Sequence, residues 1–257
     1  MSIGFILTIF ALGCIGSFLS GMLGIGGAII NYPILLYVPA LLGFPTFTAH
    51  EVTGIVAVQV FVSTLSGTWY YRGSKFVNKS LILNMGVPMF VGSFLGSFGS
   101  QFGSEGQITV LYAILATMAA IMMVVPKKGT DSPLQFVKYN RWIAIIAAFI
   151  VGSVSGIVGA GGAFLLVPIM LVLLKIPTRM TIASSLVITF ISSIGATIGK
   201  VMTGQVSWLP ATILVIASLL ASPLGARISQ RVSTKVLQSV LAVVIVITSV
   251  KIWFDIL

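Results

Sequence analysis

The chain has 257 residues, of which 58% are hydrophobic and 7% are charged, and its formal net charge is +10. Soluble domains usually carry charges at roughly a quarter of their positions, so this composition excludes an ordinary soluble protein and predicts an all-α integral membrane protein. The single cysteine, Cys14, and the single histidine, His50, exclude a disulfide within the chain and a cysteine–histidine metal site. We expect no cofactor and no metal.

Ten predominantly apolar segments follow one another along the chain, and most have the roughly 20 residues that a bilayer-spanning helix needs. Together they take up most of the sequence and leave no stretch for a soluble catalytic domain. The predicted segments are residues 3–23, 27–44, 46–71, 81–102, 107–126, 141–159, 162–176, 178–199, 207–228 and 234–254.

The basic residues mark alternate connections between these segments. Twelve of the 14 lysines and arginines fall in four such connections, which leaves Lys200 and Lys251 for the opposite side. The positive-inside rule places the four clusters in the cytoplasm. We therefore expect a multi-pass protein of the plasma (inner) membrane with both termini outside the cytoplasm, and no nucleic-acid partner. Lys200, near the outer end of the eighth segment, is expected to extend to the membrane interface.

The sequence matches itself in three places, in the same order. SGMLGIGGAIINYPILL from Ser20 aligns with SGIVGAGGAFLLVPIML from Ser155, FPT with IPT, and GSFLGSFGSQ from Gly92 with ASPLGARISQ from Ala221. We expect a first membrane repeat at 1–126, a cytoplasmic linker at 127–140 and a second membrane repeat at 141–257. Five segments in each repeat would invert the second copy, as in many secondary transporters. The first two segments of each repeat either cross the membrane or form a re-entrant pair, and both arrangements preserve the inversion.

Each repeat contains a glycine cluster inside apolar sequence, at 24–27 and 159–162. Glycine costs about 1 kcal/mol in a helix interior, so each cluster is expected to break a helix. The helix that restarts presents free N–H groups and a positive dipole end, which together favour an anion. The alternative is a tight turn or helix contact with no ligand. The glycines expected to approach an anion are Gly24, Gly26, Gly27, Gly159, Gly161 and Gly162.

Several polar residues lie inside the apolar segments, where each needs a partner or a function. Asn31, one turn past the first glycine cluster, either reaches the anion or bonds to a neighbouring helix. Isolated serines and threonines usually bond to their own backbone, which is the alternative to a substrate contact. The further candidates for neutral donors to the substrate are Thr53, Ser184, Ser185, Thr189 and Gln59.

His50 and Glu51 are candidates for coupling transport to protons. Glu51 begins a core helix, and Thr48 with Glu51 also has the spacing of a capping box, which favours a structural role. His50 could titrate near neutral pH, or act as a polar residue of the interface.

The stretches GMLGIGGAIINYPILL, GIVGAGGAFLLVPIMLVLLKIPT with the following TIASSL, and ASPLGARIS resemble the TauE/SafE sulfite exporter family, also called the toluene-sulfonate uptake permeases. Through the repeat, the resemblance covers nearly the whole chain. It implies transport of sulfur-containing anions such as sulfite, thiosulfate or an organosulfonate. His50-Glu51 stands where the second repeat has Ile182-Ala183, which departs from the repeat pattern.

These observations together predict a secondary transporter of small sulfur-containing anions. Export is favoured because a negative-inside potential drives anions outward, by about 2.3 kcal/mol per charge per 100 mV. The alternatives are an anion channel, an uptake permease for an organosulfonate, and a structural subunit. An enzyme is not expected, because the chain offers no nucleophile–base pair or metal set. The expected partners are the anion and the lipid bilayer, and a homodimer is left open.

Overall fold

The computed structural model describes residues 2–23, 28–71, 77–124, 139–229, 250 and 254, and within them all regular structure is helical. The elements are α1 (Ile3–Leu23), α2 (Ala28–Leu41), α3 (Ala49–Tyr71), α4 (Lys79–Gly99), the 3₁₀ turn η1 (Ser100–Phe102), α5 (Glu105–Val124), α6 (Arg141–Val158), α7 (Ala163–Pro168), the π-helix η2 (Ile169–Leu173), α8 (Thr178–Met202) and α9 (Trp208–Ser229).

The first nine apolar segments correspond to these helices within a few residues, so the all-helical prediction is confirmed for the described residues. The tenth, 234–254, lies almost entirely outside them. Four described helices are long and apolar enough to cross a membrane, namely Lys79–Phe102, Arg141–Val158, Ala183–Met202 and Trp208–Gly225. α2 is shorter: its 14 residues extend about 21 Å, less than the roughly 30 Å of a hydrocarbon core.

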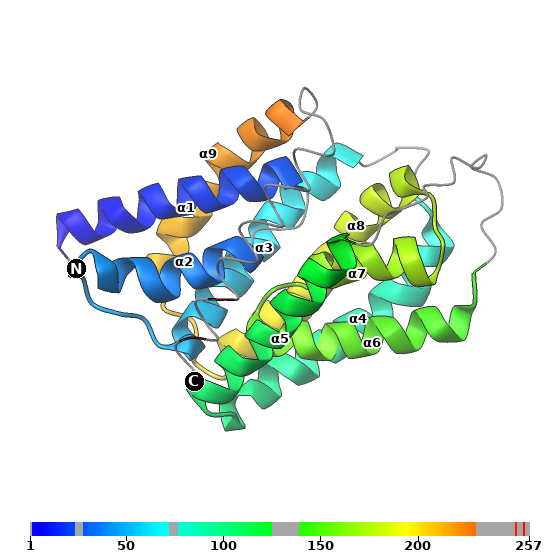
Figure 1. Cartoon of the computed structure of the whole chain (residues 1–257), viewed down its shortest axis with the longest axis horizontal. Helices are drawn as coiled ribbons and strands as arrows, with labels where there is room; N and C mark the ends of the chain where they lie inside the picture. Colours follow the sequence, from blue (N-terminus) through cyan, green and yellow to red (C-terminus); the bar gives the residue numbers. More distant parts are fainter. Residues whose placement is uncertain are drawn as a thin grey trace.

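Two pairs of helices flank a central crossing (Figure 1). α1 packs along α9, α4 packs along α6, and α3 and α8 cross between the two pairs. The central helices are antiparallel, since α3 meets α8 first through Thr53 and Lys200, and eleven residues later through Thr64 and Ser193. Residues far apart in the sequence therefore meet in the middle of the molecule.

Small residues let the helix backbones of α4 and α6 approach closely. A Cβ on Gly96 would overlap the carbonyl oxygen of Ser153, and one on Gly156 would overlap that of Ser93. The small residues Gly92 and Gly96, spaced by four in α4, therefore mark close helix packing.

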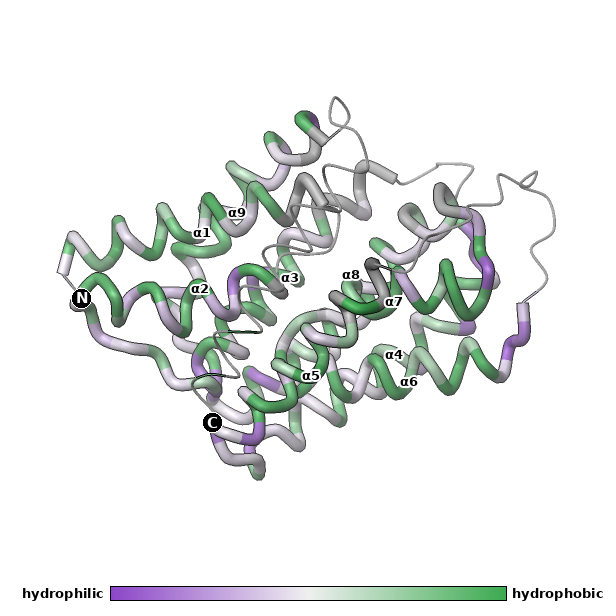
Figure 2. Tube along the Cα trace, viewed as in Figure 1, coloured by the Kyte–Doolittle hydropathy of each residue, from purple (hydrophilic) through white to green (hydrophobic). Residues whose placement is uncertain are grey.

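The outer surface of the bundle is apolar. Large hydrophobic side chains such as Ile3, Leu83 and Ile146 are exposed by more than half. Strongly hydrophilic positions lie mostly near helix ends, and hydrophobic ones along the helices (Figure 2). A surface of this kind is stable against lipid and not against water.

Candidate functional site

The second glycine cluster breaks the helix as expected. α6 ends at Gly159, whose φ is 75°, and α7 starts after Gly162, whose φ is 78°. Gly161 between them also has a positive φ, of 64°. These angles suit glycine, because a Cβ would clash with the backbone. The first cluster, Gly24, Gly26 and Gly27, lies outside the described residues.

The second break lies against the central helices. A Cβ on Gly159 would overlap the carbonyl oxygen of Thr53 in α3, and one on Gly161 would lie 2.8 Å from Val60 Cγ1 and 3.1 Å from Thr189 Cγ2. Thr189 is close to the middle of α8. The irregular backbone is thus enclosed by protein, the condition under which it is tolerated at membrane depth.

Two buried hydroxyls of α8, one of them on Thr189 beside this break, have no hydrogen-bond partner among the described residues. These are the side chains of Thr189 and Ser192, and both residues are fully buried. Leaving such a group unpaired costs about 1–3 kcal/mol, so unpaired hydroxyls are expected where water or a polar ligand supplies the missing bond.

A second group of unpaired polar atoms lies in the first repeat. Both amide atoms of Asn31 and the Oε1 of Gln59 are buried without a partner in the described part of the chain. Asn31 lies against Gly16 of α1, where a Cβ would overlap its amide oxygen, and Gln59 Nε2 donates to Ser17 at 3.4 Å. The two amides therefore meet adjacent residues of α1. The alternative role for Asn31, a hydrogen bond to a neighbouring helix, has no such bond among the described residues.

Lys200 does not extend to the membrane interface, and that prediction was wrong. Its side chain is fully buried, and its Nζ donates to Thr53 Oγ1 at 2.8 Å, to Ser100 Oγ at 2.8 Å and to Gln205 Oε1 at 2.7 Å. The physical reason is that three oxygens from α3, η1 and the α8–α9 turn satisfy the amine inside the protein. These oxygens replace the water molecules that would otherwise bind the amine at the membrane interface.

The three oxygens around Lys200 are all neutral. Within the described residues no carboxylate pairs with it: Glu51 is bound by the Thr48 N–H and the Ser207 hydroxyl, and Glu105 is exposed. The C-terminal end of α8 offers a partial negative charge worth about 0.3–1 kcal/mol. That is less than the several kcal/mol by which burying an ion is disfavoured. The lysine is held in place, but no residue in the described part of the chain balances its charge.

The two coupling candidates have defined structural partners. The Thr48 N–H donates to Glu51 Oε2 at 2.9 Å and the Glu51 N–H donates to Thr48 Oγ1 at 3.2 Å, so the capping box is confirmed. The ring of His50 contacts Gln205 Oε1 at 3.2 Å and the Gly103 carbonyl at 3.1 Å. Through Gln205, His50 thus reaches the group around Lys200.

The predicted donors on the central helices are spread along them. Thr53 lies beside Lys200. Ser184 accepts a hydrogen bond from the Asn78 N–H at 3.2 Å, and the following residue, Ser185, is also buried. Ser185 and Lys200 are 15 residues apart on α8, which is about 22 Å. Thr53 is therefore near one end of the central crossing and the two serines are near the other.

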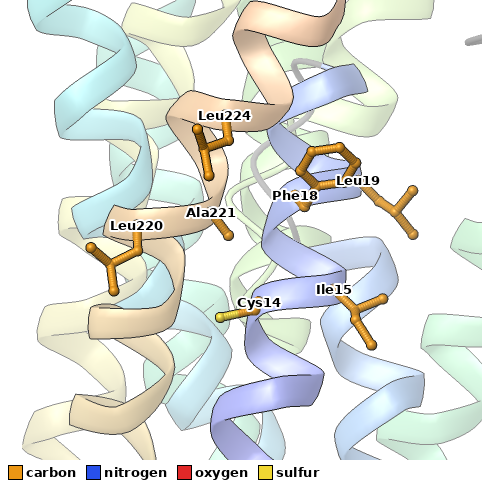
Figure 3. Close-up of a pocket in the computed structure, with 7 residues that line it drawn as sticks. All are labelled: Cys14, Ile15, Phe18, Leu19, Leu220, Ala221 and Leu224. Carbon is orange, nitrogen blue, oxygen red and sulfur yellow. The ribbon is translucent and has the colours of Figure 1, made fainter.

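A groove of about 440 Å³ lies on the outside of the bundle, between α1 and α9 (Figure 3). Apart from the Cys14 thiol, its lining is hydrocarbon, and Leu220 and Leu224 are more than half exposed. It offers no charge or amide to an anion. The groove is consequently separate from the polar site at the central helices.

Sequence reasoning missed three residues of this site. Ser100 and Gln205 lie at helix ends, and no pattern distinguishes them from other polar turn residues. Ser192 adjoins Ser193 in a helix rich in small residues. For Lys200 a signal was present: an ionisable residue within an apolar segment, with no carboxylate nearby in sequence, marks a functional site.

The apolar exterior, the membrane-length helices and the buried polar site define a multi-pass membrane protein. The chain belongs to the sulfite exporter TauE/SafE family, whose model matches residues 9–252. It is therefore a membrane transporter.

Its relatives have names of the same kind. It is 24% identical over 222 residues to the probable membrane transporter protein YunE of Bacillus subtilis, covering 79% of this chain and 81% of that protein. It is 26% identical over 225 residues to a probable membrane transporter protein of Xylella fastidiosa, and the match covers 83% of this chain and 80% of that protein. No solved structure matches the chain significantly.

Proposed function

We propose that this membrane transporter is a secondary carrier that exports small sulfur-containing anions such as sulfite, thiosulfate or an organosulfonate. The anion binds at the glycine breaks, between the central helices. The observation that carries the proposal is the second break itself, which lies against the middle of α8 beside Thr189, whose hydroxyl has no partner among the described residues. Oxyanions accept hydrogen bonds from hydroxyl and backbone N–H groups, and the break brings both kinds of donor together.

The packing supports two inverted repeats. Exchanging the repeats converts the α1–α9 pair into the α6–α4 pair, and both pairs pack extensively. The same exchange converts α3 into α8. Those two helices cross antiparallel, as two equivalent helices related by an axis in the membrane plane must do.

The inverted arrangement also accounts for the positions of Thr53 and Ser185. These residues are equivalent in the two repeats, and an inversion places equivalent residues at opposite ends of the crossing. The shortness of α2 favours a re-entrant second segment in the first repeat, because it cannot traverse the hydrocarbon core. Two such segments would direct their N-termini at one anion from opposite sides of the membrane.

Export follows from the membrane potential together with the charges of the described residues. An outward-moving anion gains about 2.3 kcal/mol per charge per 100 mV, so efflux requires no coupling ion. Glu51, at the start of α3, is bound as a helix cap. Its position fits a structural role better than that of a proton carrier.

Equilibrium binding to the purified full-length protein tests the proposal. Sulfite, thiosulfate, sulfate, taurine and sulfoacetate are titrated in turn, and the melting temperature is followed in the same samples. We expect saturable binding of at least one sulfur anion, with a rise in melting temperature. If none of the five binds to a protein that remains folded and monodisperse, the proposed substrate class is wrong.

A further inference from the structure

We propose that Lys200 supplies the positive charge that selects anions, and that it forms a polar site for a sulfur oxyanion together with Thr53, Ser100 and Gln205. The inference rests on the proposed function and deepens it. It extends the site from the glycine break toward the end of α8, because Thr53 contacts both: its carbonyl oxygen lies against Gly159 and its hydroxyl accepts from Lys200.

The hydrogen bonds around Lys200 are those of an ammonium group. Thr53 Oγ1 donates to the His50 carbonyl at 2.8 Å, and Ser100 Oγ donates to the Ser97 carbonyl at 2.6 Å, so both hydroxyls use their own proton elsewhere. The Gln205 oxygen can only accept. Three accepting oxygens at 2.7–2.8 Å from Nζ need three N–H donors, which the ammonium form has and the neutral amine lacks.

These neighbours can become donors when an anion arrives. The hydroxyls of Thr53 and Ser100 bond to carbonyls three residues earlier in their own chain segments, and such local bonds are readily exchanged. After rotation, each hydroxyl would give its proton to an oxygen of the anion. The Gln205 amide already points its Nε2 at Thr203 at 2.8 Å and would offer a further N–H. An ammonium group, two hydroxyls and an amide match the several oxygens of a sulfite or sulfonate.

The position of the site suits ligand exchange at one membrane face. Lys200 lies in the last turn of α8, and the α8–α9 turn covers it through Gln205. That turn also packs on α3, where a Cβ on Gly54 would overlap the Gln205 carbonyl. An anion therefore reaches the ammonium group when this turn separates from α3.

The lysine is not needed to satisfy its neighbours. Without it, the Thr53 hydroxyl keeps its bond to the His50 carbonyl, and the single proton of the Ser100 hydroxyl bonds either to the Ser97 carbonyl or to Gln205 Oε1 at 3.1 Å. Removing a buried charge that has no counter-charge in the described part of the chain also removes its desolvation penalty of several kcal/mol. We therefore expect Lys200→Met and Lys200→Gln to fold with melting temperatures at or above that of the parent.

The experiment compares anion affinity in Lys200→Met, Lys200→Gln and the matched control Lys79→Met, which removes an equal charge from an exposed position. Affinity for sulfite and thiosulfate should fall at least tenfold in both Lys200 variants and stay within twofold in the control. Affinity for taurine, whose own ammonium group offsets its sulfonate, should fall less.

Three results would overturn the inference: unchanged affinity in the Lys200 variants, an equal loss in Lys79→Met, or failure of both Lys200 variants to fold. The last would make the lysine a structural requirement. Failure of the proposed function is recognised separately, because the parent protein itself would then bind none of the anions.

Discussion

At the scale of single residues, the interior contains two kinds of polar group that an inert helical bundle would not keep. Lys200 has its hydrogen bonds but lacks a counter-charge among the described residues. The Asn31 amide has no hydrogen bond to any described residue. Both conditions lower the stability of the folded protein, and the interactions with a bound anion would offset that free-energy cost. We interpret both as groups kept for the ligand.

Asn31→Leu is expected to raise stability and weaken binding together. The substitution removes, at similar volume, two polar atoms that have no partner among the described residues, and Leu166, which aligns with Asn31 in the sequence, is already a buried leucine. We expect a gain of about 1–3 kcal/mol in the free energy of unfolding and at least a tenfold loss of sulfite affinity. Thermal melting and titration of one preparation measure both quantities.

Asn84→Leu is the matched control for this substitution. The Asn84 amide donates to Tyr139 at 2.8 Å, so the change should lower stability and leave affinity unaltered. Unaltered sulfite affinity in Asn31→Leu would make Asn31 a packing residue only.

Glu51→Gln separates a helix cap from a proton carrier. Glutamine retains one of the two acceptors that bind the Thr48 N–H and the Ser207 hydroxyl, so stability should fall by about 0.5–1.5 kcal/mol. The pH dependence of sulfite transport into proteoliposomes should match that of the parent protein. A flattened pH profile would show that the carboxylate couples transport to protons.

At the scale of elements, the break between α6 and α7 is the feature that sequence predicted best. Three glycines in four residues could be read directly as a helix interruption, and all three have positive φ in the second repeat. Its neighbours could not be read, because Val60, Thr189 and Thr53 reach the break through tertiary packing of distant helices. The unpaired state of Thr189 and Ser192 is likewise a property of that packing.

Gly161→Ala tests whether the break binds the anion. The variant adds strain at a positive φ, costing about 1–3 kcal/mol, and places a methyl group against Val60 and Thr189. We expect at least a tenfold loss of anion affinity. Gly43→Ala is the matched control, since its φ is 74° and a Cβ there meets nothing within 4 Å.

The control should lose stability from the same backbone strain and keep its affinity. Equal affinities in Gly161→Ala and Gly43→Ala, measured on folded samples, would reduce the break to a structural turn. The comparison avoids a bulky substitution at Gly162, where any Cβ would collide with Met89 and Ser155 and obscure the cause of a loss.

At the scale of the whole molecule, composition alone identified a helical membrane protein, because lipid leaves few alternatives for an apolar chain of this length. The helix bounds could be predicted from the sequence to within a few residues. The environment of Lys200 could not, because its position near a helix end is typical of an interfacial lysine. Its burial depends on Ser100 and Gln205, which the fold brings to it from another helix and from the following turn.

The orientation in the membrane is tested by labelling in intact cells. In a Cys14→Ser background, a membrane-impermeant maleimide should modify Ser2→Cys, which is exposed at the N-terminus. It should not modify Ser132→Cys in the linker, which lies outside the described residues, until the membrane is permeabilised. External labelling of Ser132→Cys would contradict the predicted topology, including the placement of Lys200 near the outer end of its helix.

Counterflow in proteoliposomes tests the central claim, that the chain is a carrier with an anion site between its repeats, most directly. Vesicles containing the purified protein are loaded with unlabelled sulfite or thiosulfate, and entry of the labelled anion is followed with the membrane potential clamped at zero. We predict saturable entry that is accelerated by the unlabelled anion inside, because a loaded carrier returns its site faster than an empty one. Entry that rises linearly with concentration and ignores the internal anion, or no entry above that of protein-free vesicles, would contradict the account.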